Sequence, residues 1–253
     1  MNTLTDEQSL AIVRLHYPNA VSTTETVNRT LAYLRRTCGL APDCVLLADS
    51  ICSDDVNSIE YPESARAMLG PFKLGGLDGF PHAGVTGMGA FAGHVPDSGA
   101  VLIYHAPHIG VSSDGSLGVI VRKGQSKASG CCGAARAALA KLQADSLTAE
   151  APSEFDYQQG TIEQIFLREG RRILNAQSPL KEATEVMYEA IADRIDLLVR
   201  RTSFPARYVI RSGGILINGD ANMGSFNSMR RLIRTDLLTG EVVDLMPEIS
   251  AAV

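Results

Sequence analysis

The sequence has no tryptophan, and only 6% of its residues are aromatic. It also has no apolar run that approaches the ~18 residues needed by a membrane-spanning helix. Basic residues are the minority, with 23 Lys and Arg against 28 Asp and Glu, which gives a formal net charge of −5. Nucleic acids and anionic membranes are bound by basic surfaces, so we expect neither as a partner. Because 45% of the 253 residues are hydrophobic, the chain has enough apolar material for a globular core.

Targeting signals and disulfide patterns are also missing. The first residues, MNTLTDEQSL, lack the basic and apolar segments of a secretory signal and are too acidic for a transit peptide. The five cysteines are an odd number, and Cys131 and Cys132 are adjacent, which does not suit a disulfide framework. We therefore expect a cytoplasmic protein whose cysteines are buried thiols, metal ligands or nucleophiles. Cys38 and Cys44 have no metal-like context and are interpreted as buried hydrophobes.

Helix signals open the chain. Thr5 with Gln8 and Ser22 with Glu25 both match the capping box that begins a helix, and Gly39 is a typical residue after a helix end. Further helices are expected from Pro62 and over 132–145, 156–174 and 180–201. Short apolar runs predict buried strands at 44–49, 100–104, 117–121, 208–210 and 215–217.

Buried strands interleaved with helices predict an α/β fold with a mostly parallel central sheet flanked by helices. No low-complexity linker or internal repeat divides the chain, so we expect a single domain over 1–253. Within it, the pattern separates amino-terminal helices (1–40), a core that carries the candidate site (41–145) and carboxyl-terminal helices and strands (146–253).

The segment from 50 to 133 has an unusual composition. Nine of the 23 glycines fall between Gly70 and Gly99, and four of the five histidines lie between His82 and His108. Dense glycine indicates tight turns and close backbone packing. A long, ordered loop inside a compact domain is usually functional.

Three soft metal ligands stand where predicted strands and helices end or begin. Cys52 follows the first buried strand, His108 follows the second, and Cys132 opens the predicted helix at 132. Sites in α/β sheets form beyond the carboxyl ends of strands, so we expect these side chains at one rim. Thiolate and imidazole are preferred ligands of Zn²⁺, and three protein ligands leave one tetrahedral position for water. The spacing matches no short zinc-finger pattern, and from the residues alone Cys132 remains an alternative thiol nucleophile, activated by its helix and a histidine.

Several motifs, in order, resemble the limiting-CO2-inducible protein B/C family. They are Cys52-Ser-Asp54-Asp55-Val56-Asn57, Gly70-Pro71-Phe72-Lys-Leu-Gly75-Gly76, Gly79-Phe80-Pro81, His94-Val95-Pro96-Asp97, Pro107-His108-Ile109-Gly110 and Cys131-Cys132-Gly133-Ala134-Ala135. The resemblance implies a fold like that of β-class carbonic anhydrases, a homodimer and a zinc site formed by Cys52, His108 and Cys132. It implies reversible hydration of CO2 to bicarbonate by zinc-bound hydroxide.

The resemblance also assigns a carboxylate to the candidate site. Asp54 occupies the position at which β-class enzymes place the acid that orients zinc-bound water, but Val56 replaces the arginine that pairs with it. We expect Arg66 to supply the missing cation, with Lys73 and Arg122 as weaker choices. Without such a partner, Asp54 could bind zinc itself, so a catalytically silent, inorganic-carbon-related binding or regulatory subunit is the alternative function.

The remaining polar residues of the segment have less defined roles. His94 is a candidate for lining the pocket and for exporting the proton, whereas His82 is more typical of a surface or hydrogen-bonding residue. His105 is interpreted as a packed histidine rather than a ligand. Asp55 and Asn57 are expected to satisfy the turn after the strand. Glu60 and Tyr61 could belong to the pocket or to the start of the next helix.

Overall fold

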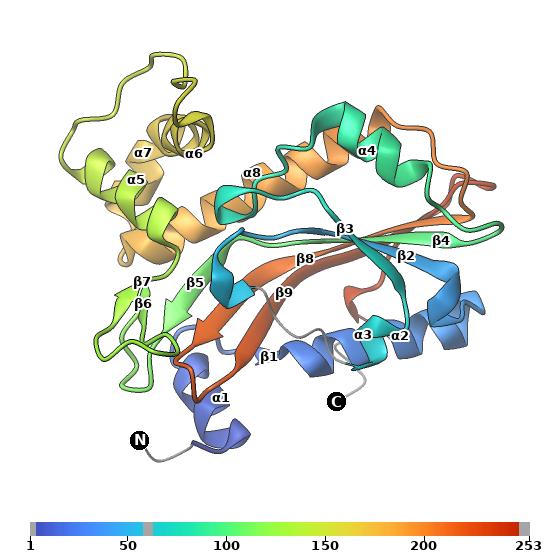
Figure 1. Cartoon of the computed structure of the whole chain (residues 1–253), viewed down its shortest axis with the longest axis horizontal. Coiled ribbons are helices and arrows are strands. Elements are labelled where there is room, and N and C mark those ends of the chain that lie inside the picture. The colour runs from blue at the N-terminus through green and yellow to red at the C-terminus, as the bar shows by residue number, and fades with distance from the viewer. Residues whose placement is uncertain (1–3, 58–62, 248–253) are drawn as a thin grey trace.

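The computed structural model describes residues 4–57 and 63–247, and its centre is a mixed, mostly parallel sheet (Figure 1). The strand order is β1-β9-β8-β4-β2-β3, with β10 paired to β9 and β5 paired to β8. The pairs among β2, β3, β4, β5 and β8 are parallel, whereas β1, β8 and β10 pair with β9 in antiparallel fashion. The predicted fold class is therefore confirmed.

The sheet strands are β1 (Val21–Ser22), β2 (Val45–Ser50), β3 (Leu69–Lys73), β4 (Ala100–His105), β5 (His108–Val111), β8 (Tyr208–Gly219), β9 (Ser225–Asp236) and β10 (Val242–Asp244). A separate hairpin pairs β6 (Val119–Ile120) with β7 (Ser129–Gly130). The α-helices are α1 (Asp6–Arg14), α2 (Thr23–Cys38), α3 (Glu63–Arg66), α4 (Gly84–Ala92), α5 (Gly133–Gln143), α6 (Tyr157–Arg168), α7 (Gly170–Asn175) and α8 (Pro179–Arg200). Single 3₁₀ turns are η1 (Pro42–Cys44), η2 (Asp55–Asn57) and η3 (Leu77–Gly79).

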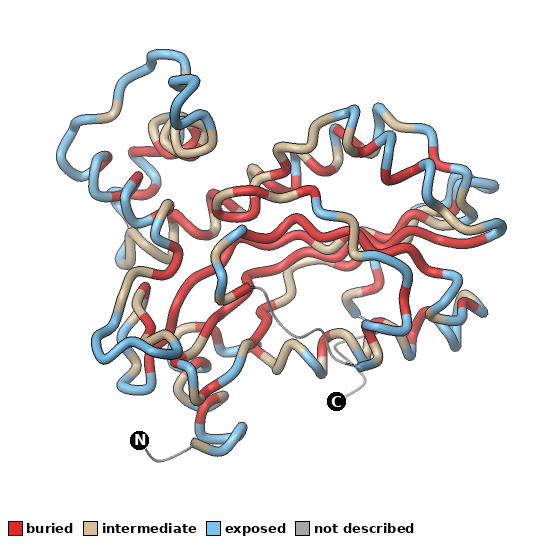
Figure 2. Tube along the Cα trace, in the orientation of Figure 1, coloured by how far each residue is buried: buried red, intermediate tan, exposed pale blue. Residues whose placement is uncertain are grey.

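Helices cover the sheet on both faces. In Figure 1, α4 and α8 lie above the sheet, α5, α6 and α7 gather at one end of it, and α1, α2 and α3 lie below. The sheet strands are mostly buried between these two layers (Figure 2). One apolar cluster joins the upper face to α4, α5, α6 and α8, and another joins the lower face to α2 and α3. Among the described residues, no helix is long and apolar enough to cross a membrane.

The predicted caps of the first two helices are confirmed. Thr5 and Gln8 form a reciprocal capping box at α1, and the Ser22 side chain accepts a hydrogen bond from the Glu25 amide at α2. Gly39 ends α2 with a φ of 66°, a conformation that costs an L-amino acid more than glycine.

The strand predictions were partly wrong. Residues 208–210 and 215–217 belong to one strand, β8, because the backbone continues through the small residues Ser212, Gly213 and Gly214 without leaving the sheet. Of 117–121, only β6 is a strand, and it pairs with β7 outside the central sheet.

Two other predictions also need correction. The helix expected over 156–174 is divided at Glu169 into α6 and α7. Cys44 is exposed and Cys38 half-buried, so their interpretation as buried hydrophobes was also wrong.

One interruption of the sheet positions the candidate site. His105 of β4 pairs with Gly213, and His108 of β5 pairs with Leu216, so both strands follow the same register along β8. Pro107 lies between them and has no amide hydrogen to donate, although its carbonyl accepts from the Leu216 amide at 3.0 Å. His108 therefore begins a strand that extends beyond the end of β2.

A half-buried ion network fastens α8 to the sheet. Asp196 of α8 accepts from Arg211 of β8 at 2.8 Å and from Arg231 of β9 at 2.7 Å. The two arginine side chains are only 13% and 15% exposed. One carboxylate therefore neutralises two poorly hydrated cations.

We expect Asp196→Asn to lower the free energy of unfolding by about 2–3 kcal/mol, because it leaves two partly buried guanidinium groups without their counter-charge. Asp193→Asn, at an exposed position on the same helix, is the matched control and should change stability by less than about 0.5 kcal/mol. Urea unfolding of the three proteins provides the comparison. Equal midpoints for both variants would contradict this assignment.

Candidate metal centre

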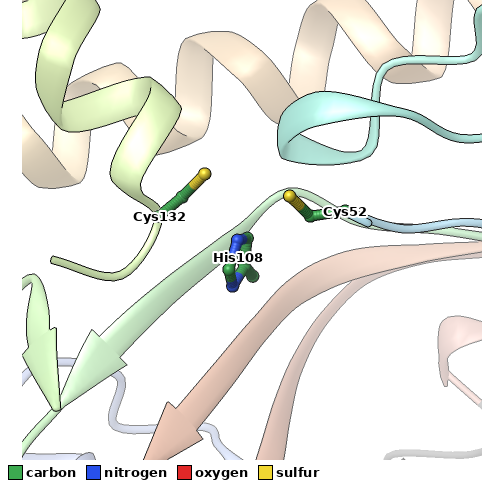
Figure 3. A group of neighbouring side chains, drawn as sticks. All are labelled: Cys52, His108 and Cys132. Carbon is green, nitrogen blue, oxygen red and sulfur yellow. The ribbon is translucent and has the colours of Figure 1, made fainter. Parts of the chain in front are cut away.

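Three separate segments bring two thiols and one imidazole together. Cys52 lies two residues beyond β2, His108 begins β5, and Cys132 is the N-cap residue of α5. One potential ligand atom from each lies within 4.8 Å of the others, and all three residues are buried. Figure 3 shows the two sulfur atoms facing the space above the His108 ring. The structure thus joins three residues that are 80 positions apart from first to last (132 minus 52).

The two thiols differ in acidity because they share one hydrogen bond. The bond from Cys132 lowers the pKa of Cys52 to about 4, even though burial opposes this. The same bond, together with burial, raises the pKa of Cys132 well above its ordinary value. Cys52 is therefore a ready thiolate ligand, and Cys132 must release its proton when a metal binds.

A tight turn covers the Cys52 sulfur. The Asp78 amide of η3 donates to Cys52 Sγ at 3.1 Å, and Asp78 Oδ1 accepts from the His108 amide at 3.3 Å. Burial raises the pKa of the Asp78 carboxyl to about 7. Gly79 completes the turn with a φ of +80°, and a Cβ there would lie 2.3 Å from the Ala106 carbonyl oxygen. Glycine at this position allows η3 to approach the β4–β5 connection.

The free imidazole nitrogen of His108 indicates a missing partner. His108 Nε2 is buried and makes no hydrogen bond within the described residues, whereas Nδ1 lies 2.8 Å from Asn218 Oδ1. Burial lowers the pKa of His108, but the thiols of Cys131 and Cys52 outweigh it and raise the pKa well above 6.5. Such a site favours a positive charge beside the sulfur atoms. Two thiolates and one imidazole form a typical three-ligand set for Zn²⁺, so these residues fit that ion.

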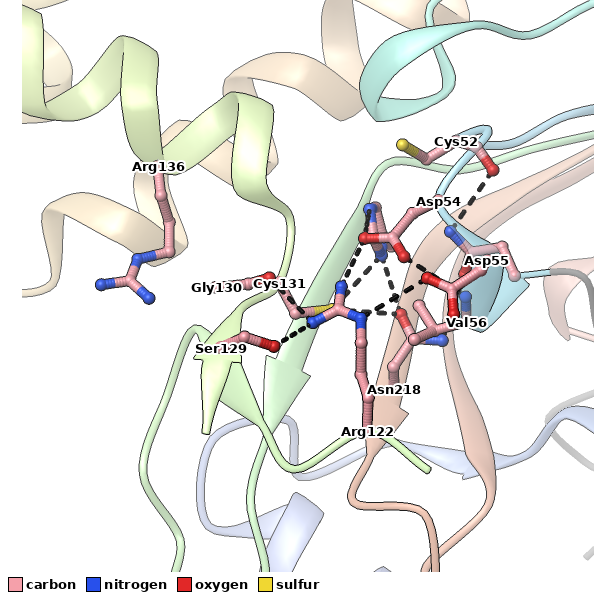
Figure 4. A network of polar contacts seen from close by, with 12 residues as sticks. Cys52, Asp54, Asp55, Val56, Arg122, Ser129, Gly130, Cys131, Arg136 and Asn218 are labelled. Carbon is pink, nitrogen blue, oxygen red and sulfur yellow. Dashed lines mark hydrogen bonds and ion pairs between the residues drawn. The ribbon is translucent and has the colours of Figure 1, made fainter. Parts of the chain in front are cut away.

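Arg122, rather than Arg66, is the cationic partner of Asp54. Arg122 Nη2 lies 2.6 Å from Asp54 Oδ2, and Figure 4 shows its guanidinium group among the surrounding acceptors. Its Nη1 donates to Ser129 Oγ at 2.6 Å and to the Gly130 carbonyl at 3.2 Å, which fixes the group in place. The preference for Arg66 was wrong because α3 packs beside α2 below the sheet, on the face opposite Cys52 and Cys132.

Asp54 remains charged next to this arginine. Burial raises its pKa, but contacts with the Asp55 side chain and the Val56 amide, and the charges of His108 and Arg122, lower it overall. Asp54 Oδ2 is 4.0 Å from His108 Nε2. Val56 lines an open cleft of about 410 Å³ together with Arg122. Val56 has no guanidinium group to pair with Asp54, and Arg122 of the β6–β7 hairpin provides it instead.

Other predicted residues lie apart from this centre. His94 is exposed in the connection between α4 and β4, where its ring contacts Phe72, so it does not line the site. His105 is fully buried and stacked on Tyr188, in keeping with a packed histidine. Lys73 pairs with Asp49 at 2.6 Å. Glu60 and Tyr61 lie outside the described residues.

Two further residues contact His108: Asn218 was not predicted to lie near the site, and Cys131 was noted only as the neighbour of Cys132. Asn218 of β8 contacts the imidazole, and Cys131 Sγ lies 3.5 Å from His108 Nδ1 and 3.6 Å from Asn218 Oδ1. Asn218 stands at the end of an apolar strand, Ile215-Leu216-Ile217, where a polar, buried side chain was the available signal. Asn57, expected only to satisfy a turn, donates to the Cys52 carbonyl at 3.4 Å and accepts from Asn218 at 3.1 Å.

Comparisons with known proteins agree with this geometry. A family model described as limiting CO2-inducible proteins B/C, beta carbonic anhydrases, matches residues 20–235. The crystal structure of PtLCIB4, a homolog of the limiting CO2-inducible protein LCIB, is 30% identical, with a TM-score of 0.79 over 93% of this chain and 98% of that one. A point mutant of PtLCIB4 is 29% identical, with a TM-score of 0.81 over 95% and 99% of the two chains.

LCIB itself is 21% identical, with a TM-score of 0.70 over 91% of this chain and 95% of that one, which shows the shared fold. No curated protein matches the chain at a significant level. The family model covers most of the chain, including the clustered Cys52, His108 and Cys132 and also Asp54. The chain therefore belongs to the limiting CO2-inducible protein B/C family of β-carbonic-anhydrase-like proteins.

Proposed function

We propose that this chain is a zinc-dependent carbonic anhydrase that interconverts CO2 and bicarbonate. The observation that carries the proposal is the buried Cys52, His108 and Cys132 group together with an Asp54 carboxylate held by Arg122 at 2.6 Å. A carboxylate that is paired with an arginine is less available as a metal ligand. The fourth coordination position is then left for water.

The chemistry divides between the ion and the chain. When bound, Zn²⁺ lowers the pKa of its water toward about 7 and supplies a nucleophile at neutral pH. Asp54 accepts a hydrogen bond and orients the attacking oxygen, and Arg122 fixes that carboxylate and keeps it charged. The balanced reaction joins water and CO2 into bicarbonate and releases one proton.

The surroundings of the thiols suit an uncharged, apolar substrate. Cys52 and Cys132 belong to the same apolar cluster as Leu74, and Leu77 and Phe80 pack against it. An apolar wall favours CO2 over water beside the metal, since CO2 loses little hydration on entering.

Stopped-flow CO2 hydration at pH 8 with zinc-loaded protein tests the proposal. We expect a rate well above buffer that scales with bound zinc, measured by elemental analysis of the same sample. A hydration rate equal to that of buffer, in protein with about one zinc per chain, would contradict the proposed catalytic function.

A second candidate is a silent zinc protein in which Asp54 closes the site. Val56 favours it because the usual neighbouring arginine is absent, and Asp54, His108 and Cys131 also lie within 4.8 Å of one another. The two functions predict opposite results for Asp54→Ala. In a working enzyme this variant loses hydration activity, whereas in a silent protein it opens the fourth position and gains activity.

A further inference from the structure

We infer that a relay of two buried amides, Asn57 and Asn218, fixes the tautomer of His108 so that Nε2 is the metal-binding nitrogen. The inference rests on the zinc site of the proposed function and concerns how the chain prepares it. Asn57, Asn218 and His108 are 3%, 3% and 1% exposed, so water does not compete for their hydrogen bonds.

The relay begins at a backbone carbonyl, which can only accept a hydrogen bond. The Cys52 carbonyl oxygen can only accept, and the Asn57 amide lies 3.4 Å from it. Asn57 must therefore turn its Nδ2 donor toward Cys52, which leaves Asn57 Oδ1 on the opposite side. The orientation of the first amide follows from the backbone of the first ligand.

Each following step transmits that orientation. Asn57 Oδ1 lies 3.1 Å from Asn218 Nδ2, so Asn218 donates to Asn57 and presents Oδ1 on its other side. Asn218 Oδ1 lies 2.8 Å from His108 Nδ1. An acceptor at this distance requires a hydrogen on Nδ1, which leaves the lone pair on Nε2 once a metal replaces the proton there.

The contacts of Cys131 agree with a hydrogen on His108 Nδ1. Its sulfur lies 3.6 Å from Asn218 Oδ1 and 3.5 Å from His108 Nδ1. The thiol donates to Asn218 Oδ1, and its sulfur faces the Nδ1 hydrogen. This places Cys131 in support of the relay and accounts for a buried thiol that does not belong to the Cys52, His108 and Cys132 group.

Asn218 is thus a positioning residue, and its removal should weaken metal binding. We expect Asn218→Leu, which has similar volume but no acceptor, to lower zinc affinity about 10- to 100-fold in a chelator competition assay. Asn218→Asp keeps an acceptor for Nδ1 and should hold the affinity within about tenfold of wild type. Asn57→Leu should weaken binding in the same direction, and its effect should not add to that of Asn218→Leu.

Nitrogen-15 NMR of the zinc-loaded wild-type protein reads the tautomer directly and does not depend on any variant folding. We expect a slowly exchanging proton on His108 Nδ1 and none on Nε2. A proton on Nε2, or an unchanged zinc affinity in folded Asn218→Leu, would overturn the relay. Neither measurement uses CO2, so a protein that binds zinc with this tautomer but does not hydrate CO2 would contradict only the proposed function.

Discussion

Replacing Cys132 by serine should abolish CO2 hydration and reduce zinc binding below one ion per chain. A serine hydroxyl is a far weaker zinc ligand than a thiolate at neutral pH. The loss should exceed the roughly 10- to 100-fold effect that removal of an outer-shell partner has on metal affinity. Zinc content after dialysis and stopped-flow hydration, measured on the same preparation, provide the two readouts.

The adjacent cysteine offers a matched control one residue away. Cys131→Ser keeps a small donor beside Asn218 and leaves the Cys52, His108 and Cys132 group intact. This variant should retain about one zinc per chain and most of the wild-type rate. Zinc loss in Cys131→Ser and retention in Cys132→Ser would show that the wrong thiol has been assigned to the metal.

Arg122→Ala should lower kcat/KM for CO2 hydration by about a hundredfold while zinc stays bound, because a preorganised charged contact is lost at the reacting centre. Without its 2.6 Å partner, the Asp54 carboxylate is free to turn toward the metal, since it already lies 4.0 Å from His108 Nε2. Stopped-flow kinetics of the zinc-loaded variant measure the change.

Lys127→Ala is the control for Arg122→Ala, because Lys127 lies in the same hairpin connection and is exposed. It should leave kcat/KM within about threefold of wild type, as expected of a surface substitution outside the site. Adding Asp54→Ala to Arg122→Ala should cause little further loss, since the two residues act as a unit. Additive losses, or a fully active Arg122→Ala, would refute the pairing as the basis of orientation.

The clustering of Cys52, His108 and Cys132 could be predicted from the sequence because it depends on topology. Cys52 and His108 follow continuous apolar runs that are buried on both faces, and a parallel sheet delivers the ends of such strands to one rim. Cys132 precedes an alanine-rich segment that forms a helix in the structure. Strong local patterns therefore predicted that these three side chains meet, whereas their assignment as zinc ligands came from the family resemblance.

Long-range side-chain contacts carried no such local signal. Arg122 reaches Asp54 from the connection that follows the two-residue strand β6, and the sequence offered only its charge, which Arg66 and Lys73 share. Asn218 and Asn57 are common polar residues whose pairing becomes visible only when β8 and η2 are adjacent.

Strand β9 and helix α4 were not predicted, because their amino-acid compositions are unfavourable for a buried strand and for a helix. Strand β9 carries Arg230, Arg231 and Arg234, whose ion pairs and hydrogen bonds with other parts of the fold compensate for low apolar content. Helix α4 contains Gly87 and Gly89, which disfavour helices in isolation. Met88 and Phe91 of the same helix are fully buried, and this packing outweighs the local preference.

Zinc-edge anomalous diffraction from crystals of the zinc-loaded protein tests the central claim most directly. We predict one strong peak about 2.3 Å from the sulfur atoms of Cys52 and Cys132 and about 2.0–2.1 Å from His108 Nε2. Water should occupy the fourth position, with Asp54 still paired to Arg122. A peak elsewhere, no peak, or an Asp54 oxygen in the fourth position would contradict an open catalytic zinc site.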